Sequence, residues 1–142
     1  MNHHDKIRVL FVCIGNACRS PMGEAIAAKD AADVIAPSSA GLYPMGMIPE
    51  MTQSTLESNG YSANGLRSKG LQEIVPEEID LVINMSGYRR AQPLEKFAQV
   101  ENWEVSDPYG ADKATYQRIL EQIRERVKTL ALRLRKEQRA AV

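Results

Sequence analysis

The apolar run Ile7 to Val12 constrains the fold more than any other segment of the chain. It is β-branched and apolar almost throughout, a pattern typical of a central strand that is buried in a parallel sheet. The run leads into a compact loop that begins with Cys13 and ends with Arg19. Ser20 is a favoured helix N-cap and Pro21 suits the first helical position, so a helix is expected directly after the loop.

Strand-like and helix-like segments alternate along the rest of the chain. Further strands are expected at residues 34–39, 81–83 and 103–105. Helices are expected at 20–32, at 49–60, at 87–97 with Pro93 as a potential break, and from residue 113 onward. This order predicts a single three-layer α/β domain, with a four-stranded parallel sheet and helices on both faces. The domain is expected to span residues 7–138, between flexible ends at residues 1–6 and 139–142.

Charge and apolar content argue against several classes of partner. Lys plus Arg and Asp plus Glu are equal at 18 each, so no bulk positive charge predicts nucleic-acid binding. No apolar run is as long as a membrane span, and residues 1–6 are too polar for a signal peptide. We therefore expect a cytoplasmic protein without a membrane partner. The two cysteines lie in one loop, unlike the cysteines of a disulfide-stapled secreted fold.

The loop from Cys13 to Arg19 has the chemistry of an oxyanion site. A cysteine between a buried strand and a helix start lies in positive potential, which favours a nucleophilic thiolate over a merely buried thiol. The guanidinium fork of Arg19 matches two oxygens of phosphate or arsenate. Gly15 is expected to supply a positive φ and Asn16 to hold the turn, so that successive N–H groups form an anion nest. The expected phosphate-binding residues are Ile14, Gly15, Asn16, Ala17, Cys18 and Arg19.

Two further residues are candidates for catalysis. Ser20 has two interpretations, as a helix N-cap and as a hydroxyl donor that stabilises the Cys13 sulfur as a leaving group. The histidines, His3 and His4, both precede the loop, which argues against a zinc site and a Cys–His hydrolase. A general acid must then be a carboxylate or a tyrosine. Asp107 begins an Asp-Pro-Tyr-Gly turn after the last expected strand, at the same rim of the sheet as Cys13. No metal or cofactor is predicted.

These residues together resemble the low-molecular-weight protein tyrosine phosphatase family. That family has a Cys-x5-Arg-Ser/Thr loop near its N-terminus and a late Asp-Pro pair, matched here by residues 13–21 and by Asp107-Pro108-Tyr109. The similarity extends to Ser39-Ala40-Gly41, to Arg67-Ser68 and to the long last helix. The matched loop begins directly after a strand, near the N-terminus, which makes the resemblance more specific than the bare Cys-x5-Arg spacing.

The resemblance implies a two-step reaction on a phosphotyrosine protein or a small aryl phosphate. Cys13 attacks phosphorus while Arg19 and the loop N–H groups hold the phosphoryl oxygens. Asp107 protonates the leaving oxygen and then activates water, and Ser20 eases departure of sulfur from the phosphocysteine. For Cys18 the resemblance implies a reversible disulfide with Cys13; packing within the loop is the alternative.

The loop at residues 42–47 is shorter than the family loop whose aromatic residue flanks the substrate ring. Tyr43 or Tyr109 is expected to supply this pocket wall. The short loop also resembles that of thioredoxin-coupled arsenate reductases, which share the fold and carry further cysteines past the third strand. Residues 84–93 contain no cysteine, so the alternative function is arsenate reduction with an external thiol and glutaredoxin. A third hypothesis is a non-enzymatic phosphate-binding or redox-sensing module, which would not need Asp107.

Overall fold

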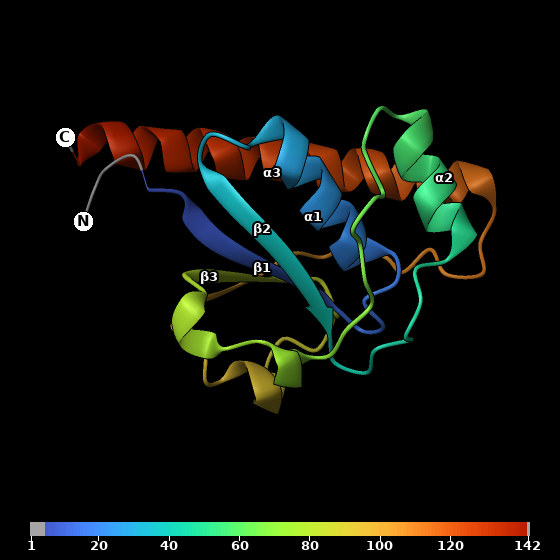
Figure 1. The fold of residues 1–142 in the computed structure, drawn as a ribbon, viewed down its shortest axis with the longest axis horizontal. Coiled ribbons are helices and arrows are strands. Elements are labelled where there is room, and N and C mark those ends of the chain that lie inside the picture. The colour runs from blue at the N-terminus through green and yellow to red at the C-terminus, as the bar shows by residue number, and fades with distance from the viewer. Residues whose placement is uncertain (1–4, 142) are drawn as a thin grey trace.

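A four-stranded parallel sheet forms the centre of the molecule, which a computed structural model describes over residues 5–141. The strands are β1 (Ile7–Cys13), β2 (Ile35–Gly41), β3 (Leu81–Asn84) and β4 (Val100–Asn102), in the order β2-β1-β3-β4 (Figure 1). The chain adds β2 on one side of β1 and then crosses to β3 on the other side. This reversal creates a switch point beyond the carboxyl end of β1, where ligands of doubly wound folds bind. Cys13 is the last residue of β1 and lies at that point.

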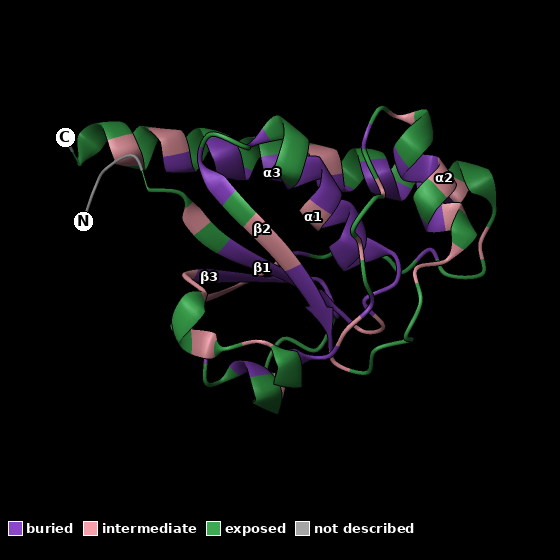
Figure 2. Cartoon of the chain, viewed as in Figure 1, coloured by how far each residue is buried: buried purple, intermediate pink, exposed green. Residues whose placement is uncertain are grey.

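All three α-helices cover one face of the sheet. They are α1 (Arg19–Asp30), α2 (Glu50–Ser58) and α3 (Lys113–Ala140), and they share a core with Val9 and Phe11 of β1. Leu10 and Val12 point to the opposite face, where the cover consists of loops and three short 3-10 helices, η1 (Leu71–Glu73), η2 (Pro76–Glu78) and η3 (Gln92–Leu94). In Figure 2 the carboxyl-terminal parts of β1 and β2 and the inner sides of α1 and α3 are buried, whereas the middle of β2 is partly exposed. The predicted α/β fold is confirmed, but loops and 3-10 helices cover the second face of the sheet in place of the α-helices expected there.

The long helix α3 closes the domain. Its N-cap is Asp112, whose side chain accepts a hydrogen bond of 2.9 Å from the Thr115 N–H. Apolar residues at spacings of three and four are buried against α1, α2 and the sheet. The helix continues to Ala140, two residues past the expected end of the domain at residue 138. Of the ends expected to be flexible, residues 1–4 and 142 lie outside the described residues.

Two predicted elements are wrong. The helix expected at 87–97 is replaced by a turn and η3, because Gly87 has a φ of 88° and Pro93 cannot donate within a longer helix. The strand expected at 103–105 lies three residues earlier, as β4. Strand β3 ends at Asn84, which pairs with Asn102 of β4. The chain after residue 103 therefore has no strand to pair with and leaves the sheet toward the end of β1. No helix among residues 5–141 is both long and apolar enough to span a bilayer.

Candidate active site

The loop after β1 turns its carbonyl groups outward. The carbonyls of Cys13, Ile14 and Gly15 accept hydrogen bonds from the N–H groups of residues 42, 43 and 45, at 3.1, 2.8 and 2.8 Å. The Ala17 carbonyl accepts from the Thr52 hydroxyl at 2.9 Å. Within residues 5–141, the N–H groups of residues 14–18 donate to no protein atom. A row of unused donors in one loop is the arrangement of an anion nest.

Asn16, and not Gly15, supplies the positive φ in this loop. Its φ is 47°, and asparagine tolerates the left-handed region better than most residues. The buried Asn16 side chain holds three segments together: its Oδ1 accepts from the Lys69 N–H at 2.8 Å, and its Nδ2 donates to the hydroxyls of Ser20 and Ser39 at 2.8 and 3.0 Å. The prediction that Asn16 holds the turn is confirmed, and the role given to Gly15 is wrong.

Ser20 does not cap helix α1. The helix begins at Arg19, after Cys18 in the N-cap position, so Ser20 lies inside the first turn. The Ser20 hydroxyl lies 2.9 Å from the Sγ atom of Cys13, and the Ser20 N–H donates to the same sulfur at 3.4 Å. The N-cap interpretation is therefore wrong, and the interpretation as a partner of the Cys13 sulfur agrees with the geometry.

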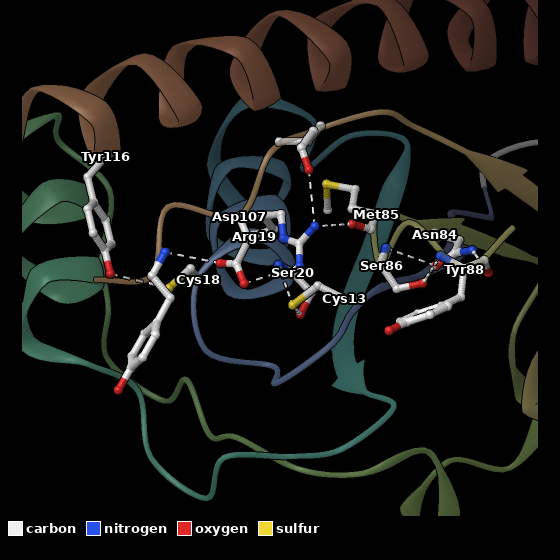
Figure 3. A network of polar contacts seen from close by, with 12 residues as sticks. Cys13, Cys18, Arg19, Ser20, Asn84, Met85, Ser86, Tyr88, Asp107 and Tyr116 are labelled. Carbon is white, nitrogen blue, oxygen red and sulfur yellow. Dashed lines mark hydrogen bonds and ion pairs between the residues drawn. The ribbon is translucent and has the colours of Figure 1, made fainter. Parts of the chain in front are cut away.

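Arg19 is buried and held from two sides (Figure 3). Its Nη1 donates to the Met85 carbonyl at 2.5 Å and to the Val105 carbonyl at 3.1 Å. Its Nη2 lies 3.6 Å from the Oδ2 of Asp107. Helix α1 brings the guanidinium back over the loop, and the segment after β4 brings the carboxylate to it. The two predicted residues, far apart in the sequence, therefore meet at one rim of the sheet.

The predicted site residues other than Asn16 and Ser20 line one pocket of about 260 Å³. Its lining includes Cys13, Arg19, Asp107, Tyr43 and Tyr109. The Asp107 side chain is 47% exposed, and its Oδ1 accepts from the Tyr109 N–H at 3.1 Å, which fixes the turn at the pocket mouth. Both tyrosines are largely exposed, so the pocket has an aromatic residue from each of two loops. Thiol, guanidinium, carboxylate and aromatic walls thus share one cavity.

Comparison with known proteins identifies the family. Residues 8–140 match the model of the low molecular weight phosphotyrosine protein phosphatases. The chain belongs to this family.

Relatives of this phosphatase-family chain include proteins named as arsenate reductases and proteins named as phosphatases. This chain is 30% identical over 129 residues to a glutaredoxin arsenate reductase of Synechocystis sp., and the match covers 89% of this chain and 98% of the relative. It is 40% identical over 87 residues, 56% of each chain, to the low molecular weight protein-tyrosine-phosphatase YfkJ of Bacillus subtilis. A solved arsenate reductase in the phosphate-binding state superposes with a TM-score of 0.81 at 27% identity, covering 90% of this chain and 98% of that one.

Cys18, the other cysteine of this family member, is buried beside helices α2 and α3. Its Sγ lies 3.5 Å from the Tyr116 hydroxyl. Burial raises the pKa of the Cys18 thiol, although hydrogen bonds with Thr52 and Tyr116 act in the opposite direction. Burial also raises the pKa of Tyr116 well above its usual value. Cys18 lines the same pocket as Cys13, both thiols are free, and a disulfide between them stays a prediction.

Sequence reasoning gave no role to several residues that support the loop. Gly41 ends β2, where an added Cβ would lie 2.7 Å from the Asn16 nitrogen and 2.8 Å from the Ile14 carbonyl oxygen. Ser68 donates to the Gly15 carbonyl at 3.1 Å and accepts from the Gly46 N–H at 3.0 Å. The signal available for Gly41 and Ser39 was their place at the carboxyl end of a strand adjacent to β1. Ser68 lies in an irregular segment, and its signal was the Arg67-Ser68 pair of the family resemblance.

Proposed function

We propose that this chain is a cysteine-dependent phosphatase that hydrolyses phosphotyrosine or another aryl phosphate monoester through a phosphocysteine. The observation that carries the proposal is the single pocket shared by the Cys13 thiol, the Arg19 guanidinium and the Asp107 carboxylate. These are a nucleophile, an oxyanion clamp and a proton donor, the three groups that such a reaction needs. The relative solved in a phosphate-binding state supports phosphate as the bound oxyanion.

In the first step the Cys13 thiolate attacks phosphorus in line with the leaving oxygen. A sulfur–phosphorus bond forms and the phosphorus–oxygen bond breaks, while Asp107 gives its proton to the leaving oxygen. The N–H groups of residues 14–18 and the Arg19 Nη2 hold the three phosphoryl oxygens. Because these donors are already aligned, charge is stabilised without rearrangement of the loop.

In the second step water attacks the phosphocysteine. Asp107, now a carboxylate, accepts a proton from the water, and the sulfur–phosphorus bond breaks to release inorganic phosphate. The sulfur leaves as a thiolate, which the Ser20 hydroxyl at 2.9 Å and the Ser20 N–H at 3.4 Å stabilise. The same two contacts stabilise the thiolate before the next attack.

An aryl group suits the mouth of the pocket. Tyr43, Met45 and Tyr109 line it and leave much of their apolar surface exposed. A phenolic ring between them would bury that surface, and aromatic pairs add to the gain from burial. A small inorganic oxyanion would leave these side chains in water.

Arsenate reduction is the second candidate, favoured by the similarity to a glutaredoxin arsenate reductase along 98% of that relative's length. In that reaction Cys13 would displace water from arsenate, and a second thiol would attack the Cys13 sulfur and release arsenite. The two thiols supply the two electrons and end as a disulfide. The turn after β3 contains no cysteine, so an external thiol would supply the second sulfur, and a glutaredoxin would reduce the mixed disulfide that this thiol forms with Cys13.

Parallel assays on one purified sample test the two functions. Hydrolysis of p-nitrophenyl phosphate and of a phosphotyrosine peptide is compared with arsenate reduction in the presence of glutathione and glutaredoxin. We expect aryl phosphate turnover that Cys13→Ser abolishes. Negligible phosphatase turnover together with thiol-dependent arsenite release would overturn the proposal in favour of the second candidate.

A further inference from the structure

The two backbone carbonyls that hold Arg19 belong to segments that are far apart in the sequence. One carbonyl belongs to Met85, directly after β3, and the other to Val105, in the segment after β4. Both accept from the same atom, Nη1, and therefore set the plane and direction of the guanidinium (Figure 3). Because oxyanion binding depends on the direction of this planar fork, whatever holds the two carbonyls also controls the site.

Asn84 is the residue that joins the two segments. Its side chain is buried, and its Oδ1 accepts from the Ser86 N–H at 3.1 Å and from the Ser86 hydroxyl at 2.7 Å. Its Nδ2 donates to the Tyr88 carbonyl at 3.0 Å and to the Asn102 Oδ1 at 2.8 Å. The amide thus closes the turn that contains Met85 and ties this turn to the end of β4.

The backbone of the same region continues the connection. The Asn84 carbonyl accepts from the Trp103 N–H at 2.9 Å, two residues before Val105. The Met85 N–H donates to the Val12 carbonyl at 2.7 Å, one residue before Cys13. Asn84 therefore lies where the end of β1, the turn after β3 and the segment after β4 meet, at the switch point of the sheet.

We propose that Asn84 is a positioning residue for oxyanion binding: its amide holds the Met85 and Val105 carbonyls so that they orient Arg19. The residue touches neither the thiol nor the pocket and acts through the guanidinium. A leucine of similar size at this position would leave the Ser86 hydroxyl and N–H, the Tyr88 carbonyl and the Asn102 side chain without their partners. The turn would then change conformation so that these polar groups could bond to water, and the Met85 carbonyl would move with the turn.

The test measures protection of Cys13 by inorganic phosphate against alkylation with iodoacetamide. It is done in a Cys18→Ala background, so that one thiol is labelled. Asn84→Leu is expected to weaken phosphate protection by about tenfold or more, the effect of a lost hydrogen bond to a charged group. The alkylation rate without phosphate should stay within about twofold, because the Cys13 contacts with Ser20 do not involve this turn.

A matched control separates positioning from stability. Asn59 exchanges side-chain hydrogen bonds with Gln117 and donates to the Thr55 carbonyl, between α2 and α3 and outside the pocket lining. Asn59→Leu should lower the melting temperature and leave phosphate protection unchanged. Asn84→Asp keeps the acceptor for Ser86 but sets a carboxylate oxygen against the Tyr88 carbonyl and the Asn102 Oδ1, so it should also weaken protection. This variant keeps the test open where Asn84→Leu does not fold. Unchanged protection in a folded Asn84→Asp or Asn84→Leu protein would overturn the proposal.

A double-mutant cycle tests whether Asn84 acts through Arg19. In an Arg19→Lys background the fork is already lost, so Asn84→Leu or Asn84→Asp should weaken protection by no more than about twofold further. Additive losses would contradict the proposal. The inference uses the oxyanion site of the proposed function, but protection requires no turnover. A protein that binds phosphate through Arg19 and hydrolyses nothing would contradict the proposed function alone.

Discussion

The Oγ atom of Ser20 lies 2.9 Å from the Sγ atom of Cys13, and a third residue, Asn16, bonds the same Oγ atom. Asn16 donates its amide hydrogen to the same Oγ at 2.8 Å. The Ser20 oxygen is thereby an acceptor toward Asn16, so its own hydrogen points to the sulfur, or to the more distant Ala40 carbonyl at 3.4 Å. The thiolate is the better acceptor, and Asn16 thus prepares Ser20 to stabilise it.

Ser20→Ala is expected to slow breakdown of the phosphocysteine more than its formation. A hydrogen bond to a charged group contributes about 1.5–3 kcal/mol, which corresponds to a fall in kcat of roughly 10- to 100-fold. Stopped-flow assays with p-nitrophenyl phosphate should show a burst of p-nitrophenolate followed by slow turnover. Ser54→Ala, which removes a half-buried hydroxyl on α2, serves as the control. Equal slowing of burst and steady state would contradict the leaving-group role.

Asp107→Asn should slow poor leaving groups far more than good ones, since only a basic leaving oxygen needs a proton. General acid catalysis contributes about 10²- to 10⁴-fold, so phenyl phosphate is expected to lose that much and a highly activated aryl phosphate much less. Values of kcat/KM across a series of leaving-group pKa check this. Asp33→Asn, which breaks an ion pair with Arg135 on the far part of α3, should leave the series unchanged. An equal loss for every ester would refute the acid role of Asp107.

Cys18→Ala should change the response to oxidation. Peroxide converts the Cys13 thiolate to a sulfenic acid, and attack by Cys18 would then release water and form a disulfide. Wild-type protein treated with hydrogen peroxide is expected to recover activity with dithiothreitol, whereas Cys18→Ala loses activity permanently through over-oxidation. Mass spectrometry of the peptide that contains both cysteines distinguishes disulfide from sulfinic acid. Similar recovery of the two proteins would show that Cys18 has only a packing role.

The buried Cys18 thiol also makes stability depend on alkaline pH. Burial raises the pKa of Cys18 in the folded state, whereas the unfolded thiol titrates near its ordinary value of about 8.5. Above that pH the unfolded chain binds fewer protons than the native one, so the free energy of unfolding falls as pH rises. Burial raises the pKa of Tyr116 too, and its effect has the same sign at higher pH.

Cys18→Ala should therefore weaken the pH dependence of the free energy of unfolding between about pH 8 and 10. Urea denaturation at several pH values gives the free energy of unfolding for both proteins, and the two curves should converge as the pH rises. Parallel curves would mean that the folded protein does not disfavour the Cys18 thiolate.

Gly41→Ala is expected to damage the site more than the fold. Its Cβ would meet backbone atoms of the phosphate-binding loop at 2.7–2.9 Å, so the loop itself must shift. Gly23→Ala is the comparison, because its Cβ would meet the Phe11 ring at 2.6 Å, inside the core. We expect Gly41→Ala to lower kcat/KM by at least about tenfold. Gly23→Ala should mainly lower stability, by about 1–3 kcal/mol. The measurements are aryl phosphate kinetics and urea denaturation, and full activity of Gly41→Ala would contradict the expectation.

The sequence was informative where the signal is local. The apolar run of β1, the loop from Cys13 to Arg19 and the spacing of apolar residues in α3 each fall within one segment, and the structure has the strand, loop and helix at these places. Local signals misled where a side chain overrides them. Residues 87–97 resemble a helix, but the Asn84 amide, the positive φ of Gly87 and Pro93 impose a turn and η3. The N-cap interpretation of Ser20 failed because the loop closes early enough to start α1 at Arg19, whereas its interpretation as a partner of the Cys13 sulfur agrees with the geometry.

The amino-acid sequence by itself determined the chemistry of this protein: which residue is the nucleophile candidate, which holds an oxyanion, and that both lie in one loop between a strand and a helix. Only the tertiary structure decided what surrounds them. The two carbonyls that hold Arg19 lie 66 and 86 residues away along the chain. Backbone carbonyls have no sequence signature, since every residue has one, and only the order β2-β1-β3-β4 brings these two to the guanidinium.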